Sequence, residues 1–368
     1  MTKAAELAKM GEVITNSQIG GRRNIAINGA MNVAQRSASV TGIGASSGYF
    51  TVDRFNILTG NSAGRLTMTQ TADGPSGFAN CIKLDCTTAD TSIAAGEFLI
   101  LEQKFEGQDL QQLKKGTSSA EKVTVSFYAK QNAERDLVLS LFDVDNDRNI
   151  AKVVTIGTSW ARHTVTFDGD TTGALGDDNA NSLTLRWFLH AGSTYTGASL
   201  STSWAANANN NLGAGIESFY GSTDNTFFIT GVQLEVGSVA TPFEHRSFGE
   251  ELAMCQRYYE ISYSYGTSEG ANTSVGLITT DTMGGDTTTA YLTHQLEYRV
   301  AKRAAPTLVF YDQAEATGKV SSHVTGISIA NGQTIAVEHA GDKSVSMNRA
   351  SGDAANGFRF HYSATSEL

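Results

Sequence analysis

The densest group of ligand-type side chains in this sequence is the acidic run Asp143-Val-Asp-Asn-Asp147. Carboxylates at alternating positions supply oxygen ligands in calcium-binding loops. An EF-hand needs a glycine at its sixth position, where this run has Arg148, and it lacks the glutamate at the twelfth. Since Asp and Asn also favour turns, the simpler interpretation is a turn between strands. We therefore predict no metal and no cofactor, and a structural calcium is the alternative, with further candidate ligands at Asp168, Asp170, Asp177 and Asp178.

The histidines are scattered along the chain, and none stands in a nucleophile motif or a metalloprotease motif. They are His163, His190, His245, His294, His323, His339 and His361. A glycosidase needs two carboxylates that flank the scissile bond, and sequence spacing does not reveal such a pair in an all-β protein. We expect surface or packing roles for these histidines. The sequence thus predicts no catalytic residue and no enzyme activity.

The segment 191–226 is the most plausible recognition surface, because it has almost no periodicity and is rich in Ser, Thr, Asn, Gly and Ala. It nevertheless carries four aromatic residues, Tyr195, Trp204, Phe219 and Tyr220. Sugar rings pack their CH faces on such side chains while Asn and Asp bind the hydroxyl groups. Glycan contact by these residues is the prediction. The alternatives are a loop that folds over its own sandwich or clasps a neighbouring subunit, with Trp204 as the packing anchor.

Composition and charge narrow the function classes. Gly alone counts 37 of 368 residues and only 17% are charged, which is typical of turn-rich all-β proteins. A formal net charge of −10 argues against a nucleic-acid groove or an anionic membrane surface. Three cysteines, Cys81, Cys86 and Cys255, lack the spacing of a zinc site and cannot form a disulfide framework, so we expect them to be free and buried.

Residues 24–246 read as one β-domain. In 122–130, Val123, Val125 and Phe127 share one face of a strand while Thr124 and Ser126 share the other. The expected strands are 53–59, 65–71, 97–105, 122–130, 137–144, 160–167, 183–189 and 227–236, with one helix at 109–115. About eight such strands favour a two-sheet jelly roll over a meander or a propeller.

A capped helix and a second, smaller β-domain follow, over 247–368. Ser247 stands three residues before Glu250, the spacing of a capping box, and the helix should extend to about Tyr258. Alternating apolar residues then predict further strands at 292–300, 307–312, 324–330, 334–339, 343–349 and 358–362.

The N-terminal residues 1–23 read as a helical arm. Leu7, Met10 and Ile14 lie at heptad-like spacing, but about twelve residues are too few for a stable isolated helix. The apolar stripe therefore needs a partner, either copies of itself in a homotrimer or a neighbouring protein. A frayed arm that lies on its own domain is the alternative.

Four stretches together resemble the tail-fibre and other virion structural proteins of tailed bacteriophages, especially phages of aquatic bacteria. They are 228–259, 24–36, 53–55 and 106–115, and the final Phe358-Arg-Phe-His-Tyr362 is also similar. The resemblance implies a jelly-roll module like those that bind carbohydrates. Arginines lie in or beside these motifs, and in a charge-poor chain each suits a pair with a carboxylate such as Asp53, Glu244 or Glu250.

The resemblance implies a tail-fibre or tail-appendage subunit, most simply a homotrimer, that attaches the virion to a host-surface glycan. Its partners would be further copies of itself and neighbouring tail or virion proteins. We expect no nucleic-acid partner because of the net negative charge, and no membrane insertion because no apolar run is long enough to span a bilayer. We expect assembly in the host cytoplasm, since the N-terminus lacks a signal peptide. The alternatives are a capsid-bound fibre or decoration protein and, from another class, a polysaccharide depolymerase.

Overall fold

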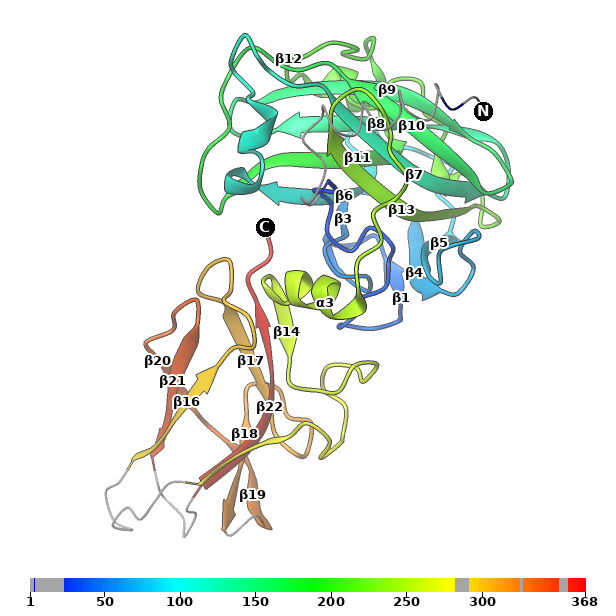
Figure 1. Cartoon of the computed structure of the whole chain (residues 1–368). Helices are drawn as coiled ribbons and strands as arrows, with labels where there is room; N and C mark the ends of the chain where they lie inside the picture. Colours follow the sequence, from blue (N-terminus) through cyan, green and yellow to red (C-terminus); the bar gives the residue numbers. More distant parts are fainter. Residues whose placement is uncertain (1–2, 4–22, 282–290, 325–326, 351–356) are drawn as a thin grey trace. The chain divides into compact units, whose positions relative to one another are not determined.

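A computed structural model describes residues 3, 23–281, 291–324, 327–350 and 357–368 (Figure 1). The chain divides into two compact units. The first unit holds residues up to Asn32 together with Ser39–Tyr49 and Phe55–Arg246, and the second holds Val33–Ala38, Phe50–Arg54 and Ser247–Leu368. No helix among the described residues is long and apolar enough to cross a membrane.

The first unit is a jelly-roll sandwich of two antiparallel sheets, which confirms the predicted fold class. The six-stranded sheet runs in the order β1 (Ser39–Ile43), β4 (Arg65–Thr71), β5 (Cys81–Thr88), β13 (Thr226–Val236), β7 (Val123–Gln131) and β10 (Ala161–Phe167). The seven-stranded sheet runs in the order β12 (Ala205–Ala206), β9 (Arg148–Ile156), β8 (Arg135–Asp143), β11 (Asn181–Ala191), β6 (Phe98–Glu106), β3 (Asn56–Gly60) and β2 (Gly48–Tyr49).

The core of this unit lies between the two sheets because each strand turns one apolar face inward. Val123, Val125 and Phe127 of β7 are buried, and the Phe127 ring meets Trp187 of β11 edge-on at 5.7 Å between centroids. The eight strands predicted from alternation are present with small shifts at their ends, while β1, β2, β5, β9 and β12 were not among them.

The predicted helix over 109–115 is wrong. The chain there forms two short 3-10 turns, η1 (Gly107–Asp109) and η2 (Gln111–Leu113). Leu110 between them has φ −112° and ψ 0°, and Lys114 has φ 49° in the left-handed region, so neither continues an α-helix. Leu110 and Leu113 are buried, which indicates that packing of these two side chains sets the backbone path.

The segment 191–226 covers part of the outer face of the seven-stranded sheet. It contains α2 (Ser193–Thr196), β12, η3 (Asn209–Asn211) and η4 (Phe219–Gly221). Apolar residues of the segment pack on a cluster that the sheet presents on this face. The sheet contributes Ile100, Val138, Ala151 and Phe188, and the segment contributes Tyr195, Leu200, Leu212 and Ile216.

The second unit is a smaller β-rich body with one helix, α3 (Phe248–Gln256). The predicted capping box is confirmed: the Ser247 hydroxyl accepts from the Glu250 backbone N–H, and the Glu250 carboxylate accepts from Ser247. One sheet has β22 (Gly357–Thr365) at its centre, paired with β14 (Tyr259–Ile261), β15 (Ile278–Asp281), β17 (Thr307–Tyr311) and β18 (Val320–Val324), and β19 (Ile327–Gln333) pairs with β18. A three-stranded sheet has the order β16 (Tyr291–Glu297), β21 (Ser344–Ala350) and β20 (Ala336–Glu338).

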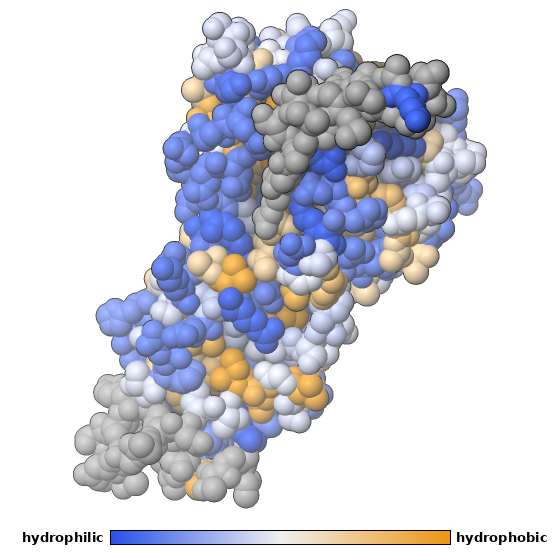
Figure 2. All heavy atoms as spheres, in the orientation of Figure 1, coloured by the Kyte–Doolittle hydropathy of each residue, from blue (hydrophilic) through white to orange (hydrophobic). Residues whose placement is uncertain are grey.

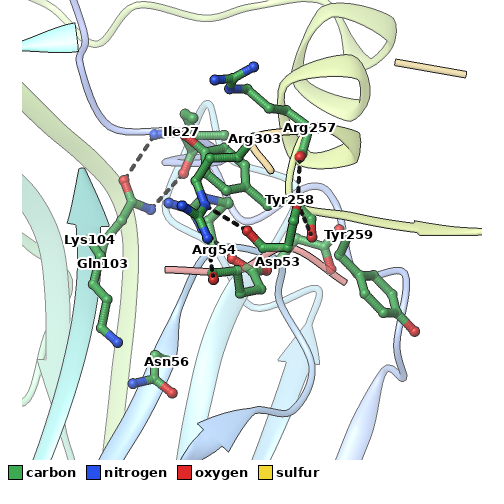
Figure 3. Close-up of polar contacts among 12 residues, drawn as sticks. Ile27, Asp53, Arg54, Asn56, Gln103, Lys104, Arg257, Tyr258, Tyr259 and Arg303 are labelled. Carbon is green, nitrogen blue, oxygen red and sulfur yellow. Dashed lines mark hydrogen bonds and ion pairs between the residues drawn. The ribbon is translucent and has the colours of Figure 1, made fainter. Parts of the chain in front are cut away.

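Arg36 and Arg246 form carboxylate pairs expected from the sequence, and Arg54 pairs with Glu367, which the sequence did not indicate. In the second unit, Arg36 Nη1 lies 3.5 Å from Asp53 Oδ1, and Arg54 pairs with Glu367 while its guanidinium lies 3.4 Å from the centroid of the Tyr258 ring (Figure 3). Burial raises the pKa of Asp53 to about 6 even though Arg36 opposes this shift. In the first unit, Arg246 Nε lies 3.5 Å from Glu244 Oε1.

The same motifs also tie the first unit together through the backbone. The Gln103 side chain donates to the Ile27 carbonyl at 2.8 Å and accepts from the Ile27 N–H at 3.0 Å, as Figure 3 shows. These contacts indicate a structural role for Ile27 and for the paired arginines of the motifs. The three cysteines are free and buried, as predicted.

Candidate functional site

Two of the four aromatic residues predicted to contact glycan are buried in the first unit. Phe219 is 3% exposed and Tyr220 is fully buried. Their rings meet each other at 5.6 Å between centroids, and the Tyr220 ring meets His190 edge-on at 5.2 Å. Neither ring offers a face to solvent, and this placement corrects the expectation of a direct glycan contact by these two residues.

Tyr195 and Trp204 are half-buried, and both make contacts within the first unit. Tyr195 meets Phe98 edge-on at 5.3 Å between ring centroids and belongs to the apolar cluster on the seven-stranded sheet. Trp204 donates from Nε1 to the Asp168 carbonyl at 2.7 Å. This packing corresponds to the alternative of a segment that folds over its own sandwich, and glycan contact by Tyr195 and Trp204 stays a prediction. Leu7, Met10 and Ile14 lie outside the described residues, so docking through them also stays a prediction.

The acidic region considered for calcium holds a lysine ammonium. Lys115 Nζ lies 2.5 Å from Asp143 Oδ2 and 3.0 Å from Asp170 Oδ2. It also donates to the carbonyl oxygens of Thr172 and Gly173, each at 2.9 Å. We call these five residues the lysine cradle. Four oxygens around one buried ammonium are the ligands that a hard cation would use, so Lys115 supplies the positive charge that this group of oxygens needs.

Asp170, Asp145 and Asp168 of this region have further protein partners. Arg148 donates from Nε to Asp170 at 2.7 Å, and hydrogen bonds from Arg148 and Lys115 lower the pKa of Asp170 although burial acts to raise it. Asp145 accepts from the Gly176 N–H at 2.8 Å, and Asp168 pairs with Lys122 at 2.8 Å. These contacts explain the acidic run as turn and ion-pair chemistry.

The surface of the molecule is mostly polar. In the view of Figure 2, hydrophilic residues dominate and hydrophobic residues form small separate groups. The large apolar side chains that are strongly exposed are scattered along the sequence; they include Ile93, Val144, Val153, Val239, Phe248, Tyr265, Val275 and Val337. A gathering of aromatic rings on a sheet face is therefore distinctive in this chain.

Such a gathering lies on the outer face of the six-stranded sheet. Its members are half-buried residues, so the set lies at the surface of the unit and not in its core. We call the set of Phe78, Tyr128, Trp160, Phe228 and Phe243 the aromatic patch. Register explains how strands far apart in sequence bring these rings to one face: Phe228 of β13 pairs with Lys130 of β7, and Tyr128 lies two residues before Lys130.

One side of the aromatic patch is built around Lys130. Its ammonium lies 4.6 Å from the centroid of Phe228 and 5.2 Å from that of Trp160. The two rings meet edge-on with centroids 6.2 Å apart. Lys130 Nζ also pairs with Asp73 at 2.8 Å, which holds the ammonium beside both rings.

The other side of the patch is a closely packed ring group. Phe78 lies 5.2 Å from Tyr128 and 4.9 Å from Phe243 between centroids, and the exposed His245 ring lies 5.3 Å from Phe78. Gly231 sits beneath them with φ +62°, and a Cβ there would stand 2.7 Å from the Phe78 ring and 2.8 Å from Tyr128. Glycine at this position therefore permits both the left-handed backbone and the close approach of the rings.

Half-exposed rings on a sheet face can bind apolar surfaces such as the CH faces of sugar rings, while nearby charged groups hydrogen-bond hydroxyls. Our sequence reasoning missed this set because its members come from separate elements. Two sequence patterns indicated outward-facing aromatic residues. Tyr128 and Lys130 fall on the outward face of an alternating strand, and Phe228 follows Phe227, so that one of these two rings must face outward.

No protein-family model matches the sequence, and no curated protein matches it. Among solved structures the chain is similar to a family 4 carbohydrate-binding module at 15% identity and a TM-score of 0.29, over 58% of this chain and 99% of that one. It is similar to the family 22 xylan-binding domain of Xyn10C from Paenibacillus barcinonensis at 11% identity and a TM-score of 0.28, over 60% and 100%. It is also similar to a family 11 module from Clostridium thermocellum at 10% identity and a TM-score of 0.27, over 56% and 99%.

Proposed function

We propose that this protein binds glycans through the aromatic patch and serves as a structural subunit of a bacteriophage virion, most simply a tail-fibre or tail-appendage subunit that attaches to the host surface. The glycan part rests on one observation, the five half-buried rings on the outer face of the six-stranded sheet. The virion part rests on the resemblance of the four sequence stretches, whose arginines and carboxylates form the internal pairs described above.

The mechanism of binding follows from the rings and their neighbours. A sugar ring would stack on Trp160 or Phe228, while the Lys130 ammonium and Asp73 carboxylate would bond its hydroxyl groups. One stacked aromatic ring contributes about 1 kcal/mol, which is about a fivefold change in affinity. A single copy should therefore bind weakly, and a homotrimer on a virion would reinforce the contact by avidity.

The test uses the purified full chain and soluble host polysaccharides, with retardation in an affinity gel as the measurement. Trp160→Ala should weaken binding about fivefold. Trp204→Ala is the matched control, because Trp204 belongs to the segment 191–226 and not to the patch. Glycan-induced change in tryptophan fluorescence gives a second readout, which should disappear in Trp160→Phe and persist in Trp204→Phe.

The outcomes separate the hypotheses. Loss of binding in Trp204→Ala with normal binding in Trp160→Ala would place the glycan on the segment 191–226, as the sequence predicted. Normal binding in both variants would reject both surfaces. Release of reducing ends during incubation would indicate a depolymerase, and labelled antibody on negatively stained virions would distinguish a tail location from a capsid location.

A further inference from the structure

A second buried group of ligand-type side chains lies in the first unit, away from the aromatic patch and the lysine cradle. Asp90 follows β5, Glu97 precedes β6 and His190 lies near the end of β11. They are 5%, 4% and 0% exposed. One ligand atom from each, a carboxylate oxygen or a ring nitrogen, lies within 4.8 Å of the others.

Local structure fixes each side chain in place. The register between β6 and β11 shifts between Phe188 and His190, an irregularity of the kind that re-aims a side chain. The Asp90 carboxylate accepts from the Ala63 N–H at 3.0 Å and from the Ser92 N–H at 3.3 Å. His190 Nδ1 lies 2.7 Å from the Ser218 hydroxyl, so Nε2 is the nitrogen that faces Glu97, 3.3 Å from its Oε2.

Two carboxyl groups buried this close together need a proton or a cation between them, because an uncompensated buried charge is costly. Among the described residues, neither Asp90 nor Glu97 forms an ion pair with a lysine or arginine.

A polar group beside the cluster also lacks a partner. Tyr220 is fully buried, its ring meets His190, and its hydroxyl has no hydrogen-bond partner among the described residues. A water bound to an ion in the cluster would give this buried hydroxyl a hydrogen-bond partner.

We propose that Asp90, Glu97 and His190 bind a divalent transition-metal cation of the Zn²⁺ class. One imidazole nitrogen and two carboxylate oxygens suit Zn²⁺, which takes such ligands at about 2.0–2.2 Å, whereas calcium prefers a site made of oxygens only. The ligand atoms, now within 4.8 Å of one another, would close to about 3.4 Å around a tetrahedral ion by small side-chain rotations. Ser218 would act as a positioning residue, because a metal-bound histidine bonds a second group through its other ring nitrogen.

The full chain should first be stripped with EDTA and dialysed, and then titrated with Zn²⁺ by calorimetry. We expect saturation at one ion per chain and a melting temperature that rises with Zn²⁺ concentration. Co²⁺ in place of Zn²⁺ should give the intense visible absorption of a tetrahedral site, a readout that does not depend on stability.

Glu97→Gln and His190→Gln should each weaken binding at least about 10-fold, and Ser218→Ala about 10-fold. The matched control is His339→Gln, since His339 is exposed and belongs to the second unit. Should His190→Gln fail to fold, Glu97→Gln carries the test, because a neutral amide of the same shape removes a charge without leaving a cavity. Absence of a saturable Zn²⁺ or Co²⁺ signal, or a signal equal in Glu97→Gln and the parent protein, would overturn the proposal, and a response to Ca²⁺ alone would overturn the assigned metal class.

Discussion

The lysine cradle and the group of Asp90, Glu97 and His190 lie in the same unit, and each buries two carboxyl groups close together. They differ in whether a basic side chain lies beside these carboxyl groups. In the lysine cradle, Asp143 and Asp170 face the Lys115 ammonium and Asp170 also faces Arg148, so the chain supplies its own cations. In the other group two buried carboxyl groups lie beside a histidine, and neither of them pairs with a lysine or arginine among the described residues. The contrast teaches that buried acidic residues indicate a metal site only where the chain does not supply a cation of its own.

The largest effect should come from removing the cation of the lysine cradle. Lys115→Met leaves the buried Asp143 carboxylate without a cation and leaves Asp170 with Arg148 alone, and we expect a loss of about 3–5 kcal/mol in the free energy of unfolding, measured by urea denaturation at pH 7. Lys114→Met is the control: the Lys114 side chain is 54% exposed, so its removal should change stability by less than about 0.5 kcal/mol. A change below about 1 kcal/mol in Lys115→Met would show that the cradle tolerates uncompensated charge.

A pair of isosteric changes compares the two groups directly. Asp143→Asn removes a charge that Lys115 uses, and we expect a loss of about 2 kcal/mol, because hydrogen bonds to charged groups contribute that much. Glu97→Gln in EDTA removes a charge that no cation faces, so its effect should stay within about 1 kcal/mol of either sign. Equal losses of unfolding free energy in the two variants, measured under the same denaturation conditions, would contradict the distinction between a carboxylate that pairs with a lysine and one that does not.

Trp204 should contribute less to the free energy of unfolding than the Lys115 ammonium that lies beside its ring. Its ring centroid lies 5.2 Å from Lys115 Nζ, and its Nε1 donates to the Asp168 carbonyl. Trp204→Phe keeps a ring over the ammonium but loses the hydrogen bond, so we expect a loss of about 1 kcal/mol in unfolding free energy. No change at all would mean that the indole does not anchor the segment 191–226, and it would leave this residue free for the glycan contact predicted from the sequence.

The smallest effect on stability concerns a half-buried histidine with no ion pair among the described residues. His163 stacks on Phe127, its Nε2 has no partner among the described residues, and partial burial lowers its pKa from 6.5. The unfolded chain therefore binds a proton first as the pH falls, and the folded state loses stability from about pH 6.5 downward until the folded pKa is passed. His163→Gln should flatten this slope, while His339→Gln should leave it unchanged.

Local patterns predicted most of the fold. The alternation in β7 and the spacing of Ser247 and Glu250 each encode a structure within a few residues, and both are present. The turn at Asp143–Asp147 was also a local inference. What the sequence did not reveal depends on contacts between distant residues: Lys115 reaches Asp143 across 28 positions, and His190 reaches Glu97 across 93.

The aromatic patch shows the same limit from another side. Trp160, Phe228 and Phe78 are unremarkable in their own segments. The pairing of β7 with β10 and β13 brings Trp160 and Phe228 together, and the pairing of β13 with β5 brings in Phe78, which precedes β5. The predicted helix over 109–115 failed for a related reason, since burial of Leu110 and Leu113 sets that backbone rather than local propensity.

The residues 33–38 and 50–54, which the sequence grouped with the jelly roll, belong to the second unit because Arg36 and Arg54 pair with Glu367 there.

The central place of β22 has a consequence for the order in which the protein folds during synthesis. Every strand of the first unit has been translated once Val236 is made. The complete sandwich can therefore fold while the rest of the chain is still being synthesised. The second unit must wait, because β14, β15, β17 and β18 all pair with a strand that is translated after them. A nascent chain stopped before Gly357 should therefore carry a folded, protease-resistant first unit beside unpaired strands that proteases and chaperones recognise.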